Sequence, residues 1–399
     1  MLHMQHEVVP VLRVVVSLHS SPASTGGGTV ITLARMSQLG LQEFHHSLGA
    51  RFGDVAGEEV VLDYGNAPTE HAALRESAGV LDLSFRGRLC VVGADRTRFL
   101  NGQVTNNVKE LKPGSGCYAA ITNNKGKIQC DLNIHCLADE LLLDFEPGQS
   151  AKITERLEKF VVADDAQIVE VAPHYGLLSV QGPKSAAVVL AVGLFPELPE
   201  KPFQSVKAAD VTLGEIYLVH MPRAGFAGFD LFVPVAALGA VADKLIAAAK
   251  ELGGCACGWT ALDMARIEAA IPRFGADMDE TNLPHEAGIE SRAVSYTKGC
   301  YIGQEVINRI RSFGQVSRAL RGLRLPDALA VLPARGDKLF HGGKEVGHIT
   351  SAVASPALRA NIALGYVRKE CNAIGTELTL RSESGEWPVK IVPAPFGVQ

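Results

Sequence analysis

The sequence predicts an α+β protein, and three observations support this class. Predicted strands and helices alternate irregularly between residues 36 and 315, without the regular strand–helix order of a doubly wound parallel sheet. After residue 316 the pattern changes to short apolar runs separated by Gly, Pro and Asp, which is typical of a small β-barrel or sandwich. The 399 residues are too many for one ordinary hydrophobic core, so we expect two or three domains.

The first 35 residues differ from the rest of the chain. They are rich in Ser and Gly and contain one acidic residue, Glu7. Their apolar patch is short for a signal-peptide core, and no clear cleavage site follows it. A Ser-rich, acid-poor segment also fits an organellar transit peptide, although arginine is sparse here. We predict an unstructured extension at 1–35, a folded region at 36–315 and a barrel domain at 316–399.

Local signals place the first elements of the folded region. Thr69 is a good N-cap and Gly79 a good helix stop, which predicts a helix over 69–78. The turn chemistry of residues 123–126 joins two apolar runs and predicts a β-hairpin. The hairpin strands are expected at 114–121 and 128–136, other strands at 59–64, 80–84 and 88–93, and helices at 37–46 and 95–100.

The later elements follow from the same signals. An Ala-rich amphipathic run predicts a long helix at 236–252, and Pro272 follows a second helix at 260–269. Further helices are expected at 151–159, 184–191 and 304–312, and strands at 141–145, 168–171, 175–180 and 214–220. The predicted barrel strands are 320–325, 337–340, 345–350, 362–366, 377–381 and 389–392.

Composition and cysteine spacing limit the classes of function that this protein can have. The net charge of −5 gives no electrostatic footprint for nucleic acid, and no apolar run reaches the length of a membrane span, so we expect neither partner. The eight cysteines lack CxxC spacing and the histidines lack metal-ligand spacing, so no metal site is predicted. Cys255 and Cys257 would point away from each other on a helix. Free thiols indicate a reducing compartment, namely the cytoplasm, or the mitochondrial matrix in a eukaryote.

The segment Lys298-Gly-Cys-Tyr-Ile-Gly-Gln-Glu305 is the strongest candidate for chemistry. Its two glycines allow the backbone to approach a ligand closely or to take a positive φ. We expect a tight loop that runs into a helix beginning at Gln304. Cys300 would then lie near the positive end of that helix and near Lys298, both of which favour a thiolate. The alternative is that Cys300 is a small buried residue in a turn.

Two further sets of polar residues are candidates. Asp131 interrupts an apolar strand, where an acid can act as a general acid–base or bind a substrate amine; alternatively it lies on the exposed face of an edge strand. Arg266, Glu268, Glu280 and Glu286 lie within a short stretch of sequence. Arginine can grip a planar carboxylate or the edge of a heterocycle, and carboxylates can bind the amino-pyrimidine edge of a pterin. The alternative is a set of solvated surface charges.

Taken together, these motifs resemble the YgfZ family. The matching residues are Arg266-Ile-Glu268, Gly275, Glu280, Pro284-His-Glu286, the segment 298–305 and Gly314-Gln-Val316. From about residue 37 onward the chain is similar to the larger superfamily of the glycine cleavage T-protein, a folate-dependent aminomethyltransferase. The KGCYxGQE pattern is specific for the YgfZ branch, whereas the barrel motifs occur throughout the superfamily.

The resemblance implies a three-domain cloverleaf of the aminomethyltransferase type, with two interleaved N-terminal domains, a C-terminal β-barrel and a central hole. It implies tetrahydrofolate or a folate derivative as the bound small molecule. It also implies iron–sulfur client proteins, including tRNA-modifying enzymes, as partners. The candidate catalytic residues are Cys300, Lys298 and Asp131. The residues assigned to folate binding are Arg266, Glu268, Gln304, Glu305 and Arg223.

Two departures from the T-protein pattern favour the YgfZ branch. The T-protein has two adjacent acids on one strand, and here only the second remains, as Asp131. The T-protein segment Arg-Thr-Gly-Tyr-Thr-Gly-Glu ends in a Glu that grips the pterin. Here the segment runs from Arg223 to Phe229, without that Glu. Loss of such a buried polar contact costs about 1–3 kcal/mol of binding free energy unless it is replaced.

We therefore predict a folate-binding, YgfZ-type protein that supports assembly or maintenance of iron–sulfur clusters, with Cys300 as its working thiol. One thiolate cannot complete the usual four-cysteine ligation, so a partner or a small thiol would share the cluster. This leaves open whether the protein is an enzyme. The alternative is a tetrahydrofolate-dependent aminomethyltransferase, with Asp131 as the acid, that forms methylenetetrahydrofolate from an aminomethylated lipoyl carrier. A third interpretation is a folate sensor in which Cys300 is inert.

Overall fold

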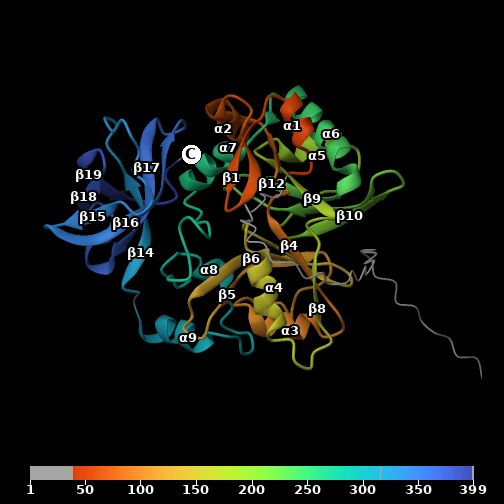
Figure 1. Cartoon of the computed structure of the whole chain (residues 1–399), viewed down its shortest axis with the longest axis horizontal. Coiled ribbons are helices and arrows are strands. Elements are labelled where there is room, and N and C mark those ends of the chain that lie inside the picture. The colour runs from red at the N-terminus through yellow and green to blue at the C-terminus, as the bar shows by residue number, and fades with distance from the viewer. Residues whose placement is uncertain (1–38, 315, 398–399) are drawn as a thin grey trace, which may run out of the picture.

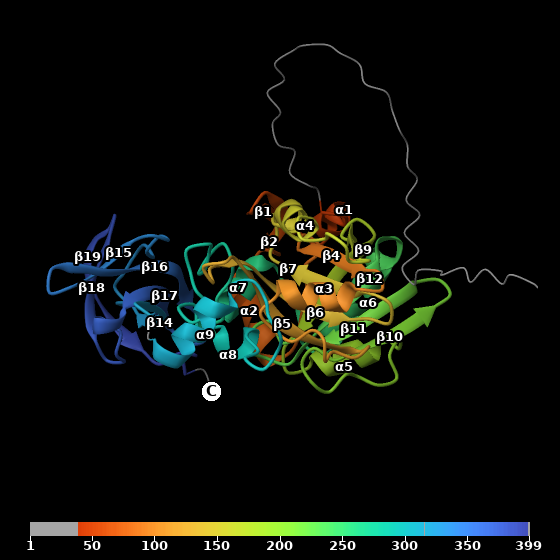
Figure 2. The same cartoon turned by 90° about the horizontal axis from the view of Figure 1, so that it is seen from below.

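The computed structural model describes residues 39–314 and 316–397, which form three lobes (Figure 1). The predicted extension at 1–35 lies outside the described residues. Two lobes are built on separate β-sheets with helices, and the third is a closed β-barrel. The barrel lies to one side of the other two lobes in both views (Figure 2). The predicted α+β class and the C-terminal barrel are confirmed.

The first lobe contains a six-stranded sheet in the order β10–β11–β12–β9–β3–β13. Its central strands are almost continuously apolar because both of their faces are buried. Helices α5 (Ser185–Ala191) and α6 (Leu238–Glu251) pack their apolar sides against it. The strands are β3 Gly79–Asp82, β9 Tyr175–Gln181, β10 Ser205–Asp210, β11 Gly214–His220, β12 Gly228–Pro234 and β13 Cys255–Ala256.

The second lobe contains a five-stranded sheet in the order β5–β6–β7–β4–β8. The predicted hairpin is present, because β5 and β6 pair antiparallel around the turn at 123–126. Helices α3 (Arg96–Gln103) and α4 (Ser150–Glu158) pack against this sheet. The strands are β4 Gly87–Val92, β5 Ser115–Thr122, β6 Ile128–Cys136, β7 Leu141–Phe145 and β8 Gln167–Glu170.

The chain passes from the first lobe to the second and back. Strand β3 joins the six-stranded sheet, β4 to β8 then build the other sheet, and β9 returns to the first. Helix α7 (Trp259–Glu268) packs on α2 (Ala67–Glu76), β2 (Glu58–Asp63) and barrel strand β16 (Lys344–Ser355), so its side chains reach the place where the lobes meet. The remaining elements are α1 Gln42–Ser47, β1 Arg51–Val55, β2 Glu58–Asp63, α2 Ala67–Glu76, α8 Glu290–Ala293 and α9 Gln304–Phe313.

The third lobe is a barrel closed in the order β14–β17–β16–β15–β18–β19. Its six strands overlap the six predicted ones, because each apolar run packs into one shared core. The strands are β14 Arg318–Arg324, β15 Lys338–His341, β16 Lys344–Ser355, β17 Ala360–Arg368, β18 Glu377–Ser382 and β19 Gly385–Val392. Two short 3₁₀ helices lie at Val235–Ala237 and Lys369–Cys371.

The sequence prediction missed strands β1, β10, β12 and β13 and helix α8. The first two carry partly exposed, polar residues, so their apolar signal is weak and only pairing with a neighbouring strand fixes them. The predicted cap of α2 was also wrong. Asn66 is the N-cap, and its side-chain oxygen accepts a hydrogen bond from the Thr69 N–H at 3.1 Å.

Two general expectations concern thiols and membranes. All eight cysteines are free, in agreement with the predicted thiols. Among residues 39–314 and 316–397, none of the helices is both long enough and apolar enough to cross a membrane.

Candidate functional site

A cavity of about 340 Å³ opens where the two sheet-containing lobes meet helix α7. Its volume lies in the range of small-molecule binding sites. Three kinds of side chain converge on it, namely aromatic rings, arginines and carboxylates. The rings belong to Tyr118, Phe203 and Trp259, the arginines are 86, 223, 266, 273 and 292, and the carboxylates belong to Asp131, Glu146 and Asp263.

Asp131 is the most unusual of these side chains. Its Oδ2 accepts a hydrogen bond from the Tyr118 hydroxyl at 2.7 Å, whereas its Oδ1 is buried without a partner. Burial, reinforced by the nearby charge of Glu146, raises the pKa of Asp131 to about 6. A carboxyl group with such a pKa exchanges a proton close to neutral pH, which suits a general acid–base. Strand β6 presents Asp131 and Asn133 on the same face because strand side chains alternate.

The arginines beside Asp131 are held by a buried carboxylate, Asp144. This residue is 0% exposed and accepts hydrogen bonds from Arg86 Nε at 2.7 Å, Arg223 Nη2 at 2.8 Å and Asn133 Nδ2 at 2.8 Å. Arg223 also donates to Asp230 at 2.8 Å. The network joins strands of both sheets, so it fixes the cavity wall that the two lobes share.

Three of the predicted site residues line the cavity, namely Asp131, Arg223 and Arg266. The Arg266 guanidinium is already engaged, because it donates to Asp263 at 2.8 Å, to Asp277 and to the Ser351 hydroxyl at 2.8 Å. Arg266 therefore stabilises the cavity wall through these partners and has few N–H donors free for a ligand. The predicted residues outside the lining are Glu268, Lys298, Cys300, Gln304 and Glu305.

Glu268, which the sequence assigned to folate binding, lies outside the cavity lining. Its carboxylate is buried and accepts hydrogen bonds from His71 Nε2 at 2.9 Å, Arg75 Nη1 at 3.2 Å and the Ser355 hydroxyl at 2.5 Å. Burial alone would raise the pKa of Glu268, but these partners lower it. Glu268 thus ties α7 to α2 and to the barrel.

Lys298, which the sequence placed beside a Cys300 thiolate, donates its hydrogen bonds to backbone carbonyls. Its amine is buried and donates to the backbone carbonyls of Asn101, Val104 and Asn106 at 2.5, 2.6 and 2.7 Å. Burial lowers the pKa of Lys298 to about 8. The Lys298 side chain therefore holds the end of α3 and the residues that follow it.

The rest of the 298–305 segment is explained mostly by packing. Gly303 has φ +90° as the N-cap of α9, and a Cβ atom there would lie 2.4 Å from the carbonyl oxygen of Asn123. Tyr301 is buried in the core, whereas the Cys300 side chain is exposed. Gln304 and Glu305, which the sequence assigned to folate binding, lie in the first turn of α9 and outside the cavity lining.

Sequence reasoning missed Tyr118, Glu146, Trp259 and Arg273. Two signals could have found some of them. Trp259 lies one residue before the predicted helix 260–269, and Trp259, Asp263 and Arg266 are spaced i, i+4 and i+7, so a helix extended by one residue places them on one face. Tyr118 lies two positions before the residue that pairs with Asp131 in the predicted hairpin, within reach of that carboxylate.

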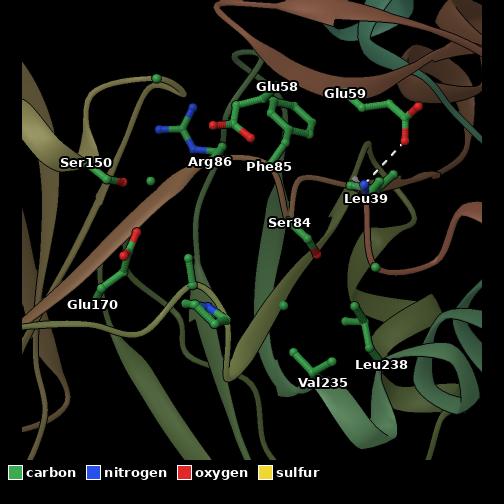
Figure 3. A pocket seen from close by; sticks show the side chains of 16 residues that line it. Leu39, Glu58, Glu59, Ser84, Phe85, Arg86, Ser150, Glu170, Val235 and Leu238 are labelled. Atoms are coloured by element: carbon green, nitrogen blue, oxygen red, sulfur yellow. Dashed lines mark hydrogen bonds between the residues drawn. The ribbon is translucent and has the colours of Figure 1, made fainter. Parts of the chain in front are cut away.

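A second cavity of about 390 Å³ shares Arg86 with the first. Figure 3 shows Arg86 and Glu58 on one side of it and the apolar Val235 and Leu238 on the other. Glu59, also in the lining, accepts a hydrogen bond from the Leu39 N–H at 3.3 Å. Burial, with the charges of Asp54 and Glu170, raises the pKa of Glu58.

Comparisons with known proteins agree with the fold. The model of the GCVT N-terminal domain matches residues 41–298, and the model of the glycine cleavage T-protein C-terminal barrel domain matches residues 318–397. The chain is 28% identical to an aminomethyltransferase of Halalkalibacterium halodurans, covering 91% of this chain and 99% of that protein. It is 30% identical to an aminomethyltransferase of Symbiobacterium thermophilum, covering 89% and 96%.

The crystal structure of glycine cleavage system aminomethyltransferase T from Bartonella henselae superposes with a TM-score of 0.82 at 26% identity, covering 91% of this chain and 99% of that one. The comparisons thus support the transferase alternative better than the YgfZ branch that the sequence favoured. The two matched domains together with this shared architecture show that the chain belongs to the glycine cleavage T-protein family.

Proposed function

We propose that the cavity lined by Asp131 and Trp259, called the central cavity from here on, binds tetrahydrofolate. We propose further that the protein transfers an aminomethyl-derived one-carbon unit, with Asp131 as the acid. The observation that carries this proposal is the buried, unpartnered Oδ1 of Asp131 in the cavity lining. A buried polar atom without a partner calls for an explanation, and a ligand hydrogen bond supplies one. The names of the relatives support the same activity.

The residues present fit a reduced folate. Trp259 offers a ring surface for a planar heterocycle, and the Arg273 guanidinium lies 4.5 Å from the centre of that ring. Glu146 Oε2 is a second buried oxygen without a hydrogen-bond partner, and such carboxylates accept hydrogen bonds from an amino-pyrimidine edge. Arg292 is exposed at the rim, where a cation would attract the carboxylates of a glutamyl tail.

The missing T-protein Glu does not remove this fit. Phe229 stands at that position, and its side chain is buried in the core of the six-stranded sheet. Glu146 and Asp263 supply carboxylates to the cavity from other elements, namely the end of β7 and helix α7. We therefore infer that one of these acids takes over the pterin contact.

Tetrahydrofolate supplies, when bound, the nitrogen that accepts the one-carbon unit. The chain's own contribution is to hold a proton on Asp131 at a pKa near neutrality and to keep that carboxyl away from water. Tyr118 fixes the orientation of the carboxyl by donating to its other oxygen. The arginine–aspartate network keeps the wall rigid while the substrate enters.

The test is release of ammonia from an aminomethylated lipoyl carrier protein, measured against tetrahydrofolate concentration. We expect folate-dependent turnover by the wild type. The Trp259→Leu variant should need about 5- to 160-fold more folate because it loses a stacking surface worth about 1–3 kcal/mol. Trp387→Leu, which removes the other tryptophan from barrel strand β19, is the matched control and should behave as the wild type. Absence of turnover at saturating folate would rule out the transferase function.

A second candidate function is the YgfZ-type support of iron–sulfur proteins, including tRNA-modifying enzymes. The observation that favours it is the exposed Cys300 thiol in a segment whose Lys298, Tyr301 and Gly303 all have packing roles. Packing does not require a cysteine at an exposed loop position, so the thiol itself is the candidate working group. The eight free cysteines favour a reducing compartment, the cytoplasm or the mitochondrial matrix, for either function.

Complementation separates the two functions. In a strain that lacks its own YgfZ protein, the activity of a [4Fe–4S] tRNA-thiomethylating enzyme is measured with the wild type, Cys300→Ala and Asp131→Ala. The YgfZ-type function predicts that Cys300→Ala fails and Asp131→Ala succeeds. Equal rescue by Cys300→Ala and the wild type would leave Cys300 without a role in this process.

A further inference from the structure

We propose that Cys255 and Cys257 form a reversible, peroxide-driven disulfide that acts on the start of helix α7, beside the central cavity. The two sulfur atoms lie 3.8 Å apart. Disulfide formation requires about 2.05 Å, so the sulfurs must approach each other by less than 2 Å. This inference goes beyond the proposed transfer reaction and does not depend on it.

The backbone explains why these thiols meet. The sequence argument assumed a helix, on which positions i and i+2 point apart, but the segment is extended. Cys255 N–H donates to the Ala78 carbonyl at 3.2 Å, and Cys257 N–H donates to the Val80 carbonyl at 2.8 Å, so both residues are anchored along β3. In extended chain, side chains two positions apart share a face. The expected separation of the two thiols was therefore wrong.

The two thiols differ in a way that suits an attacking and a resolving cysteine. Cys255 is half-buried and can be reached from solvent, whereas Cys257 is buried and its Sγ donates to the Glu70 carbonyl at 3.4 Å. The contact with Cys257 lowers the pKa of Cys255 and raises the pKa of Cys257. The accessible sulfur is thus the better nucleophile, because the thiolate is the reactive form. Within the described residues, no cluster of three or more metal-ligating side chains competes for these sulfurs.

The reaction balances with one hydrogen peroxide molecule. The Cys255 thiolate attacks one peroxide oxygen, the O–O bond breaks, and water leaves after protonation. The sulfenic acid on Cys255 is then attacked by the Cys257 sulfur, which forms the S–S bond and expels a second water. The two sulfurs lose two electrons, peroxide gains them, and the two thiol protons end in the two waters. A small dithiol reverses the step by exchange.

Oxidation of Cys255 and Cys257 would affect the cavity through the residues that follow them in the chain. Cys257 is followed by Gly258, the N-cap of α7, whose N–H donates to Glu70 Oε2 at 2.8 Å. A Cβ atom on Gly258 would lie 2.3 Å from the Leu62 carbonyl oxygen, so the backbone has little free space at this point. We therefore expect movement of the Cys257 sulfur away from Glu70 to shift the adjoining first turn of α7. Trp259 in that turn lines the cavity.

The main test is a peptide measurement on the full-length protein. Cleavage after Lys250 and Arg266 releases peptide 251–266, which contains Cys255 and Cys257 and no other cysteine. After stoichiometric hydrogen peroxide we expect this peptide to lose two hydrogen atoms, to resist alkylation, and to regain both thiols with dithiothreitol. In Cys255→Ser the change should be absent, while Cys300→Ser should leave it intact. Two freely alkylated thiols, or oxygen added to a single sulfur in the wild type, would overturn the proposal.

A second measurement tests the link to the cavity. Trp387→Phe leaves Trp259 as the only tryptophan, so fluorescence then reports on the first turn of α7. We expect peroxide to shift this emission and dithiothreitol to restore it. Adding Cys255→Ser should abolish the response. Unchanged emission in a protein whose peptide 251–266 carries the disulfide would overturn the proposed effect on α7.

Discussion

Replacing Asp131 with Asn should lower the rate of one-carbon transfer by about 10²- to 10⁴-fold, the usual contribution of a general acid–base. The amide keeps the shape of the side chain and can still accept from the Tyr118 hydroxyl, so the cavity should remain intact. It cannot deliver a proton from a group whose pKa is about 6. The measurement is folate-dependent ammonia release, with folate binding followed in parallel. A variant that binds folate and retains full turnover would contradict the acid role.

The acid role of Asp131 also predicts the direction in which the transfer rate changes with pH. Asp131 as an acid is active when protonated, so the rate should fall as pH rises through about 6. Tyr118 donates to the carboxylate and lowers the pKa of Asp131, so Tyr118→Phe should move the fall to higher pH. A rate that rises through this range would instead indicate a base.

Asp131→Asn should raise stability above pH 6 although it lowers activity. The pKa of Asp131 is raised in the folded protein from about 3.9 in the unfolded chain, so folding favours the neutral form. Stability is therefore lost as pH rises from about 4 to 6, and the ionised group costs about 1–3 kcal/mol of unfolding free energy above that range. Asp131→Asn should recover this amount at pH 8 and change little near pH 4. Urea unfolding at the two pH values checks the difference.

Replacing Asp144 with Ala should destabilise the protein by about 3–5 kcal/mol, the usual cost of removing one partner from a buried ion pair. Arg86 and Arg223 would each keep one carboxylate, Glu146 or Asp230, but would lose the residue that holds them together. Burial alone would raise the pKa of Asp144, yet the two guanidiniums lower it well below its usual range. Its contribution is therefore complete at neutral pH and lost only in strong acid.

Urea unfolding at pH 7 measures this loss. The matched control is Lys207→Ala, which breaks the 2.8 Å pair with Glu215 between two partly exposed side chains. That change should cost less than about 1 kcal/mol because solvent screens the pair. Equal effects of the two substitutions would show that the Asp144 network does not stabilise the shared wall of the cavity.

The sequence by itself determined most of the elements and the barrel. The turn at residues 123–126 fixed the β5–β6 hairpin, and the apolar periodicity fixed α6 and α7. Local patterns sufficed because capping, turn chemistry and apolar spacing act over a few residues. They also singled out Asp131, since an acid on an apolar strand is visible without coordinates.

Only the tertiary structure decided which polar side chains already have hydrogen-bond or ion-pair partners within the protein. Lys298 and Glu268 were predicted as site residues, yet both are hydrogen-bonded to segments distant in the chain, Lys298 to Asn101 and Glu268 to His71, each 197 positions away. Cys255 and Cys257 meet because β13 pairs with β3, a contact between distant segments. A hydrogen bond or ion pair depends on distance in space, and the spacing of residues along one chain does not encode that distance for segments brought together by folding.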